Sequence, residues 1–228
     1  MARSAHTKVL IVDEHPLYSK GLSSLLETHN NFNIIGIAAN ASDALKIAEK
    51  EKPRLIILEI RLGKENGIEL IAKFKAQNQQ IIILVISAND ERFYSERVLR
   101  MGARGYIMKN ADTNTVMEAV KTVMNGKIYL SENERERIFQ AMTGDSKSGT
   151  KDWTMSLEKL SNRELQVFTL LGKGYGTIEI ASRFNISTKT IDSHKEHIKL
   201  KLHCSTSQEL RQLAIEWTTN SSDIQNTM

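Results

Sequence analysis

Five short apolar runs, rich in β-branched residues, recur along the first half of the chain and constrain its fold more than any other feature. They cover residues 9–12, 34–37, 55–58, 81–86 and 106–108. Their apolar positions are continuous rather than alternating, which is typical of parallel strands that are buried on both faces. Amphipathic helical patterns lie between them. We therefore expect an α/β domain over residues 1–126, with a doubly wound five-stranded parallel sheet.

The second half of the chain has a different character. Residues 127–156 begin with charged helix formers and continue into the Gly- and Ser-containing stretch 144–149, which predicts a linker with one helix before its flexible part. From residue 157 onward only helical patterns remain. We expect an all-α domain over 157–218 and a flexible tail over 219–228.

Composition narrows the class of protein only moderately. The net charge is +4, with 31 basic and 27 acidic residues, so it neither demands nor excludes a nucleic-acid partner. Cys204 is the single cysteine and cannot form an internal disulfide. No apolar run approaches the ~20 residues needed to span a bilayer, and the first residues lack a signal-peptide pattern. We expect a cytoplasmic protein with no membrane association.

Polar residues follow four of the five expected strands. Asp13 and Glu14 follow the first strand, Glu59 the third, Ser87 the fourth and Lys109 the fifth. The carboxyl ends of parallel strands meet at one edge of the sheet, where ligands bind. Carboxylate oxygens suit Mg²⁺, and a hydroxyl with an ammonium suits a phosphoryl group. Each residue alone also fits a helix cap or a solvated loop, but their joint placement favours a site.

The segments around these residues resemble the receiver domain of NarL/FixJ-family response regulators. The matching segments are 9–17, 58–62, 66–70, 87–88 and 102–109. The resemblance implies a flavodoxin-like fold, a phosphoprotein, and Mg²⁺ held by Asp13, Glu14 and the phosphoacceptor. It also implies that Ser87 and Lys109 contact the phosphoryl group and that Tyr106 changes rotamer on activation. A core aromatic residue is an equally good interpretation of Tyr106.

One position departs from the family pattern. The family's phosphoacceptor is an aspartate, whereas this chain has Glu59. The extra methylene moves the carboxylate away from the acidic pair and towards the place that a phosphoryl group would occupy. Such a glutamate is compatible with a naturally divergent receiver or with an introduced mimic of the phosphorylated state. We expect no stable acyl phosphate on Glu59, and we expect its carboxylate to approach Ser87 and Lys109.

A helix-turn-helix pattern occupies the C-terminal region. Ser161 followed by Glu164 predicts a capped helix start, and a short helix over 177–184 precedes a longer one over 188–202. One face of the longer helix is apolar. The other face carries hydrogen-bond donors that we expect to contact DNA: Lys189, Thr190, Ser193, His194, His197 and Lys201. An ordinary solvated helix face is the plainer alternative.

Residues 157–218 resemble the LuxR-type helix-turn-helix that accompanies this kind of receiver. The matching segments are 160–164, 179–181, 186–194 and 201–202. The resemblance implies double-stranded DNA as a partner, a homodimer, and a sensor histidine kinase upstream. The helix expected over 207–217 fits either dimerisation or packing within its domain. A second possible dimer surface lies on the receiver, near 93–99 and 116–123.

These patterns together predict a transcription regulator of a two-component system, not an enzyme, whose receiver works without phosphorylation. An enzyme that uses Glu59 as nucleophile or base is one alternative, but no P-loop or Gly-rich dinucleotide motif supports it. A protein-interaction module with vestigial DNA binding is another. A metal site made of His194, His197 and Cys204 would lack a fourth ligand.

Overall fold

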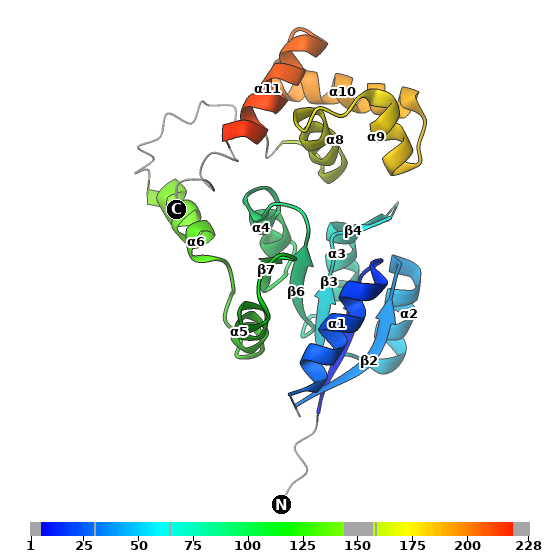
Figure 1. Ribbon diagram of the computed structural model, residues 1–228, viewed down its shortest axis with the longest axis vertical. Helices are drawn as coiled ribbons and strands as arrows, with labels where there is room; N and C mark the ends of the chain where they lie inside the picture. Colours follow the sequence, from blue (N-terminus) through cyan, green and yellow to red (C-terminus); the bar gives the residue numbers. More distant parts are fainter. Residues whose placement is uncertain (1–5, 30, 64, 144–156, 158, 221–228) are drawn as a thin grey trace, which may run out of the picture. The chain divides into compact units, whose positions relative to one another are not determined.

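A computed structural model of the chain contains two compact units, residues 1–145 and 146–228. It describes residues 6–29, 31–63, 65–143, 157 and 159–220 (Figure 1). Residues 144–156 of the predicted linker, which include its Gly- and Ser-containing stretch, and residues 221–228 of the predicted tail lie outside these ranges. Within the described ranges, no helix is both long enough and apolar enough to cross a membrane.

The N-terminal unit is built on a five-stranded parallel sheet in the order β2-β1-β3-β6-β7. The strands are β1 (Thr7–Val12), β2 (Phe32–Ala38), β3 (Leu55–Leu58), β6 (Ile82–Ser87) and β7 (Gly105–Met108). Strand order reverses across β1 and β3, as in a doubly wound sheet. The predicted fold class is therefore confirmed, and each apolar run forms the strand expected of it.

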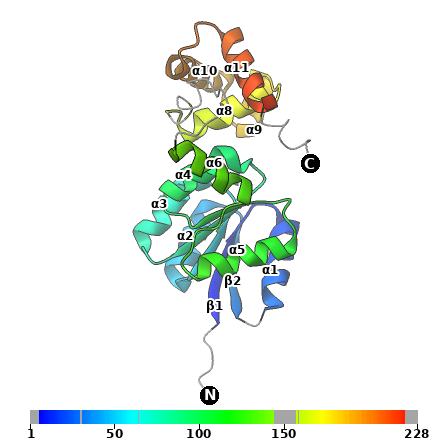
Figure 2. The same cartoon turned by 90° about the vertical axis from the view of Figure 1, so that its left-hand side faces the viewer.

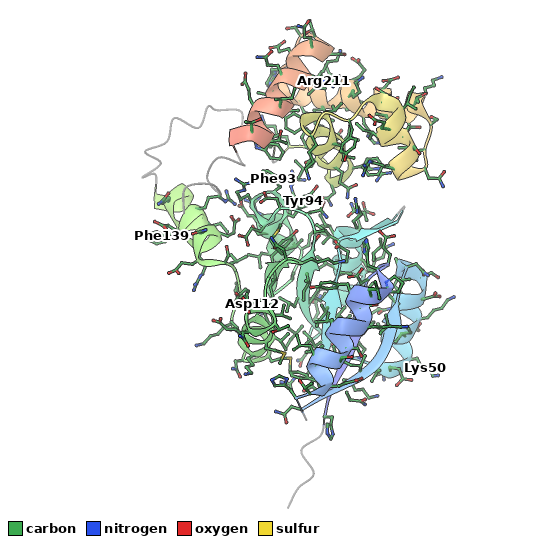
Figure 3. The ribbon with its side chains drawn as sticks, in the orientation of Figure 1. Lys50, Phe93, Tyr94, Asp112, Phe139 and Arg211 are labelled. Atoms are coloured by element: carbon green, nitrogen blue, oxygen red, sulfur yellow. The ribbon has the colours of Figure 1, made fainter. Side chains whose placement is uncertain are left out.

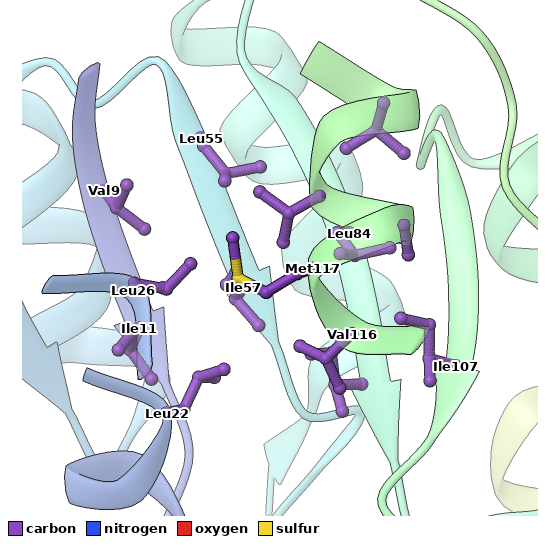
Figure 4. Packing of buried hydrophobic residues seen from close by; sticks show 14 residues of the cluster. Val9, Ile11, Leu22, Leu26, Leu55, Ile57, Leu84, Ile107, Val116 and Met117 are labelled. Atoms are coloured by element: carbon purple, nitrogen blue, oxygen red, sulfur yellow. The ribbon is translucent and has the colours of Figure 1, made fainter. Parts of the chain in front are cut away.

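Helices cover both faces of this sheet. They are α1 (Pro16–Glu27), α2 (Ala41–Glu51), α3 (Gly67–Gln77), α4 (Glu91–Arg100) and α5 (Thr113–Met124). α1 and α5 share one buried cluster with the sheet, in which Leu22 and Leu26 face Val116 and Met117 (Figure 4). α2, α3 and α4 lie on the opposite face (Figure 2). Because Val116, Val120 and Val123 belong to this core, a dimer that uses α5 must involve its other residues.

Part of the predicted linker is ordered against the receiver unit. Tyr129 forms an isolated bridge with Gly105 beside β7, and α6 (Glu132–Thr143) follows. Tyr94 on α4 and Phe139 on α6 mark the two neighbouring helices in Figure 3. A short antiparallel pair, β4 (Arg61–Leu62) with β5 (Glu65–Asn66), also lies between β3 and α3. The sequence patterns indicated neither the bridge nor this pair.

A buried polar cluster attaches α6 to α4. Glu134 is 1% exposed and accepts a hydrogen bond from the Ser95 hydroxyl of α4. Arg137 pairs with the same carboxylate, with Nε 2.8 Å from Oε2 and Nη2 2.7 Å from Oε1. Ser131 Oγ donates to Glu91 Oε1 at 2.5 Å. A buried carboxylate with this many donors holds its neighbours in a defined arrangement.

The C-terminal unit consists of α8 (Asn162–Gly172), α9 (Thr177–Phe184), α10 (Thr188–Leu202) and α11 (Ser207–Asn220). In α11, Leu210, Ala214 and Trp217 are buried, and the Trp217 ring centroid lies 5.2 Å from that of Phe168. A Cβ on Gly172 would meet Ala214 O at 2.3 Å, so this position needs glycine. The apolar stripe of α11 is thus used for packing within the unit.

Candidate functional site

The carboxyl edge of the sheet brings together most of the residues predicted for it. β1, β3, β6 and β7 run parallel, so the residues after them share one edge. Asp13, Glu59 and Ser87 are almost fully buried there, with exposed fractions of 5%, 2% and 0%. The Lys109 side chain, after β7, is 12% exposed. Four charged or polar groups of different strands therefore meet in one enclosed place.

The Glu59 carboxylate is saturated with donors. Its Oε1 accepts from Ser87 Oγ at 2.5 Å and from the Arg61 backbone N–H at 3.0 Å. Its Oε2 lies 3.0 Å from Lys109 Nζ and 3.3 Å from the Ala88 backbone nitrogen. A hydroxyl, two backbone N–H groups and an ammonium together form an anion site, and the chain's own side chain occupies it.

Lys109 joins the two buried carboxylates. Its Nζ lies 2.6 Å from Asp13 Oδ2 as well as 3.0 Å from Glu59 Oε2, and 4.7 Å from the centroid of the Tyr18 ring. Asp13 Oδ1 accepts from the His15 backbone N–H at 2.9 Å and lies 2.9 Å from His15 Nδ1. Burial, together with the charges of Asp13 and Glu59, raises the pKa of Tyr18 to about 12. One ammonium thus offsets part of two negative charges.

Tyr106 is wholly buried and belongs to the same network. Its hydroxyl donates to Asn89 O at 2.7 Å, and Asn89 in turn donates to Ser87 Oγ from its backbone N–H at 3.1 Å and from Nδ2 at 3.0 Å. Burial raises the pKa of Tyr106 well above its usual value, so the phenol stays protonated and donates. A continuous chain of hydrogen bonds therefore runs from Glu59 through the loop that precedes α4.

Glu14 does not join the other two acids. Its Oε2 lies against the turn at Gly63, 3.3 Å from where a Cβ on that residue would be. The Lys109 ammonium stands between Asp13 and Glu59 in the position that a shared cation would need. Across the described ranges, no three His, Cys, Asp or Glu side chains are grouped closely enough to hold a metal ion. Carboxylate oxygens are suitable ligands for Mg²⁺, but the Lys109 ammonium lies between those of Asp13 and Glu59, and this arrangement does not fit a bound Mg²⁺ ion.

Gly67 fixes the loop that carries Glu59. Its backbone N–H donates to Ile60 O at 2.8 Å. A Cβ at this position would lie 2.6 Å from Glu59 O and 2.7 Å from Ile60 Cα. These distances are shorter than any real Cβ contact. The start of α3 can therefore lie this close to the backbone of Glu59 and Ile60 only because residue 67 is a glycine.

The second candidate site is the outward face of α10. Ile191, Ile198 and Leu202 are buried beneath it. Ser187 caps the helix by accepting from the Thr190 backbone N–H, and Asn185 supplies the left-handed turn after α9 with φ of 51°. Of the predicted contact residues, four are exposed: Lys189, Thr190, Ser193 and His197. His194 is half-buried, and burial lowers its pKa, with Arg163 adding to the effect.

Lys201, also predicted to contact DNA, has a partner within the unit. Its Nζ lies 2.6 Å from Glu164 Oε2, and Glu164 also accepts from the Ser161 backbone N–H at 2.6 Å. Burial opposes ionisation of Glu164, but these hydrogen bonds outweigh it and lower the pKa of the carboxyl group. The side chain of Lys201 is 38% exposed, so its contact with DNA stays a prediction.

Two exposed acids, which the sequence prediction did not include, also lie on the outward face of α10. Asp192 and Glu196 are 58% and 61% exposed in their side chains. They are spaced i, i+4 and therefore share a face, which the sequence spacing alone could have indicated. The face is consequently mixed in charge rather than basic.

A doubly wound sheet with an acidic carboxyl edge, joined in one chain to a helix-turn-helix unit, defines a response regulator with a DNA-binding output domain. Comparisons with known proteins agree. Residues 9–121 match the response regulator receiver domain family, and residues 158–214 match the bacterial regulatory proteins of the luxR family. The oxygen regulatory protein NreC of Staphylococcus aureus is 30% identical over 210 residues, which cover 92% of this chain and 97% of NreC.

Solved structures show the same fold. The RcsB response regulator of Salmonella typhimurium matches with a TM-score of 0.55 and 24% identity, over 91% of this chain and 97% of RcsB. An RcsB–DNA complex matches with a TM-score of 0.56 and 23% identity, over 91% and 96%. A LuxR-family response regulator from an Aurantimonas species matches with a TM-score of 0.57 and 20% identity, over 61% and 99%. The chain belongs to the two-component response regulators of the NarL/FixJ type, with a receiver and a LuxR-type helix-turn-helix.

Proposed function

We propose that this chain regulates transcription by binding specific double-stranded DNA as a homodimer, and that Glu59 replaces the phosphoryl group that would otherwise switch its receiver. One observation supports this proposal above the others. The Glu59 carboxylate accepts from Ser87 Oγ and the Ala88 N–H and pairs with Lys109 Nζ, and these donors are suited to a phosphoryl anion.

The geometry also disfavours phosphorylation of this carboxylate. Phosphoryl transfer depends on an acceptor oxygen that is free and in line with the donor. Both oxygens of Glu59 are engaged, Oε1 by Ser87 and Arg61 and Oε2 by Ala88 and Lys109, and its side chain is 2% exposed. A carboxylate carries less charge and fewer acceptor oxygens than a phosphoryl group, so the bias it produces is weaker than full activation. Receiver domains generally bind Mg²⁺ at this edge; we propose that this one needs none.

Hydrogen bonds supply a route by which the site acts on the rest of the unit. Glu59 contacts Ser87, which Asn89 contacts in turn just before α4. The buried Ser95–Glu134 hydrogen bond then joins α4 to α6, and α6 precedes the C-terminal unit in the sequence. We propose that a change at position 59 reaches α6 by this route.

The output we propose is binding of α10 in the major groove. An RcsB–DNA complex and an assembly of two RcsB dimers bound to two parallel DNAs have been solved. By extension, two copies of this chain would present their α10 helices to half-sites about 10 bp apart or a multiple of that spacing. We propose a cytoplasmic location and a sensor histidine kinase that docks without leaving a stable phosphoryl group on Glu59.

A second function is favoured by the acids on α10. Asp192 and Glu196 would repel DNA phosphates, as expected for an interaction module whose DNA binding is vestigial. The dependence of DNA affinity on salt concentration distinguishes the two functions. A DNA-binding regulator loses affinity steeply as salt rises, whereas an interaction module shows no measurable complex with any duplex.

Intact mass spectrometry tests the receiver half of the proposal. Wild type and Glu59→Asp are incubated with Mg²⁺ and an acyl-phosphate donor. We expect a phosphate adduct on Glu59→Asp and none on wild type. Adducts of similar yield on both chains would contradict the proposal.

A further inference from the structure

On α10 two acids are more exposed than the two lysines with which they pair. Asp192 and Glu196 are 58% and 61% exposed in their side chains, whereas their partners Lys195 and Lys199 are 20% and 16% exposed. Lys195 Nζ also donates to Thr177 Oγ1 of α9 at 3.2 Å. A helix face that binds DNA only through the phosphates would expose its lysines more than its acids.

Each acid keeps one oxygen available. Lys195 Nζ lies 3.3 Å from Asp192 Oδ1, and Lys199 Nζ lies 2.9 Å from Glu196 Oε2. Within the described part of the chain, Asp192 Oδ2 and Glu196 Oε1 have no hydrogen-bond donor. The lysines reduce the repulsion between these carboxylates and DNA phosphates, and they hold one oxygen of each group in place. The remaining oxygens are free acceptors on the outward face.

Free acceptors on a recognition helix match one base better than the others. Residues near the N-terminus of such a helix reach base edges in the major groove, and Asp192 lies in the first half of α10. In that groove guanine N7 and O6 are acceptors, which a carboxylate would repel. Adenine presents its N6 donor beside the N7 acceptor, whereas cytosine presents the N4 amino donor, from which Asp and Glu accept.

We propose that Asp192 and Glu196 determine the DNA sequence that this protein selects, each by accepting a hydrogen bond from the N4 amino group of a cytosine. The inference rests on the proposed DNA-binding function and adds its specificity. Lys189, exposed on the first turn of the same helix, supplies a positive charge for the backbone phosphates.

Selection from a randomised duplex library tests this with the full-length chain at one fixed salt concentration. The variants are Asp192→Asn and Glu196→Gln, with Glu216→Gln on α11 as a control that removes an exposed acid elsewhere in the unit. Selected sites are then compared by competition binding. All three changes lie on exposed surface, so the fold is retained.

We expect wild type to select cytosine at two positions of each half-site. Asp192→Asn should reduce the preference for cytosine over the other bases about tenfold at one of these positions, and Glu196→Gln should do so at the other. Each variant should shift its preference towards adenine, because amide side chains pair with adenine. Glu216→Gln should keep the wild-type preference. If both variants keep that preference and bind every duplex more tightly, the acids only repel phosphates and the inference is wrong. If wild type selects no sequence at all, the proposed function itself is wrong.

Discussion

The sheet edge and the outward face of α10 both pair acids with lysines, but they leave those acids in opposite states. At the sheet edge, Glu59 and Lys109 expose only 2% and 12% of their side chains, and both Glu59 oxygens are engaged. On α10, Asp192 and Glu196 expose more than half of theirs. A buried and satisfied site needs no ligand to be stable, whereas exposed acceptors bind water in the free protein and can exchange it for the donors of a partner. The Glu59 carboxylate is therefore satisfied within its own unit, whereas the two acids of α10 remain accessible from outside.

Removal of the central lysine should have the largest effect. Lys109→Ala leaves Asp13 and Glu59 buried close together without their shared cation, so we expect the free energy of unfolding of the receiver unit to fall by about 3–5 kcal/mol. Urea titration followed by circular dichroism measures it. Lys46→Ala, from an exposed pair with Asp43, should change stability by less than ~0.5 kcal/mol. Equal losses in the two variants would show that the sheet edge is not a closed network.

A glycine substitution tests the backbone that supports the network. Gly67→Ala forces a Cβ to within 2.6 Å of Glu59 O, and we expect a loss of about 1–3 kcal/mol together with displacement of Glu59. Gly21→Ala is the matched control, because a Cβ there, within α1, meets nothing within 4 Å. That control should stabilise the protein slightly, by about 0.5–1 kcal/mol. The account fails here if Gly67→Ala is as harmless as Gly21→Ala.

Acid should weaken the C-terminal unit through Glu164. The pKa of this carboxyl is lowered from 4.5, because hydrogen bonds from Lys201 and Ser161 outweigh the effect of burial. The unfolded chain binds the proton more readily, so the stabilisation is present above about pH 4.5 and is lost as the pH falls through the folded-state pKa.

Lys201→Met removes one of those donors and should shift the acid unfolding midpoint of this unit to higher pH. Trp217 packs against Phe168, so its fluorescence in a Trp153→Phe background measures the transition. Lys173→Met, at an exposed position, should leave the midpoint unchanged. An unchanged midpoint in Lys201→Met would mean that the Lys201–Glu164 contact does not matter in solution.

The smallest expected effect is that of Mg²⁺ on wild type. The Lys109 ammonium already lies between the Asp13 and Glu59 carboxylates, so saturating Mg²⁺ should leave the melting temperature of wild type unchanged. Glu59→Asp shortens the side chain and frees the two carboxylates for a cation. Mg²⁺ should therefore raise the melting temperature of this variant by a few degrees. Differential scanning calorimetry with and without EDTA compares them. Equal stabilisation of both chains by Mg²⁺ would contradict the arrangement around Lys109.

The sheet and its polar edge were predictable because two simple rules coincide there. Continuous β-branched runs indicate buried parallel strands, and the ends of such strands converge. Asp13, Glu59, Ser87 and Lys109 were therefore found from position alone. Glu14 was expected to join them, but the left-handed turn at Gly63 (φ 56°) lies against its carboxylate, and no local pattern reveals where a side chain of this length turns.

Other features depend on contacts between residues far apart in the sequence. Ser95 and Glu134 form a buried pair between α4 and α6, and Lys201 pairs with Glu164 of α8. Apolar periodicity carries no signal for such polar pairs. Asp192 and Glu196 are a different case. Their spacing places them on the outward face of α10, but their carboxylates accept hydrogen bonds, whereas the residues predicted to contact DNA were hydrogen-bond donors.

DNA affinity of the unphosphorylated chain tests the central claim most directly. Wild type and Glu59→Asp are compared on one selected operator at fixed salt, before and after treatment with an acyl-phosphate donor and Mg²⁺. We predict that untreated Glu59→Asp dimerises and binds DNA about tenfold more weakly than wild type, a coupling of ordinary size for such switches. Treatment should restore Glu59→Asp and leave wild type unchanged. If untreated wild type and Glu59→Asp bind equally, or if treatment strengthens wild type, Glu59 does not replace the phosphoryl group.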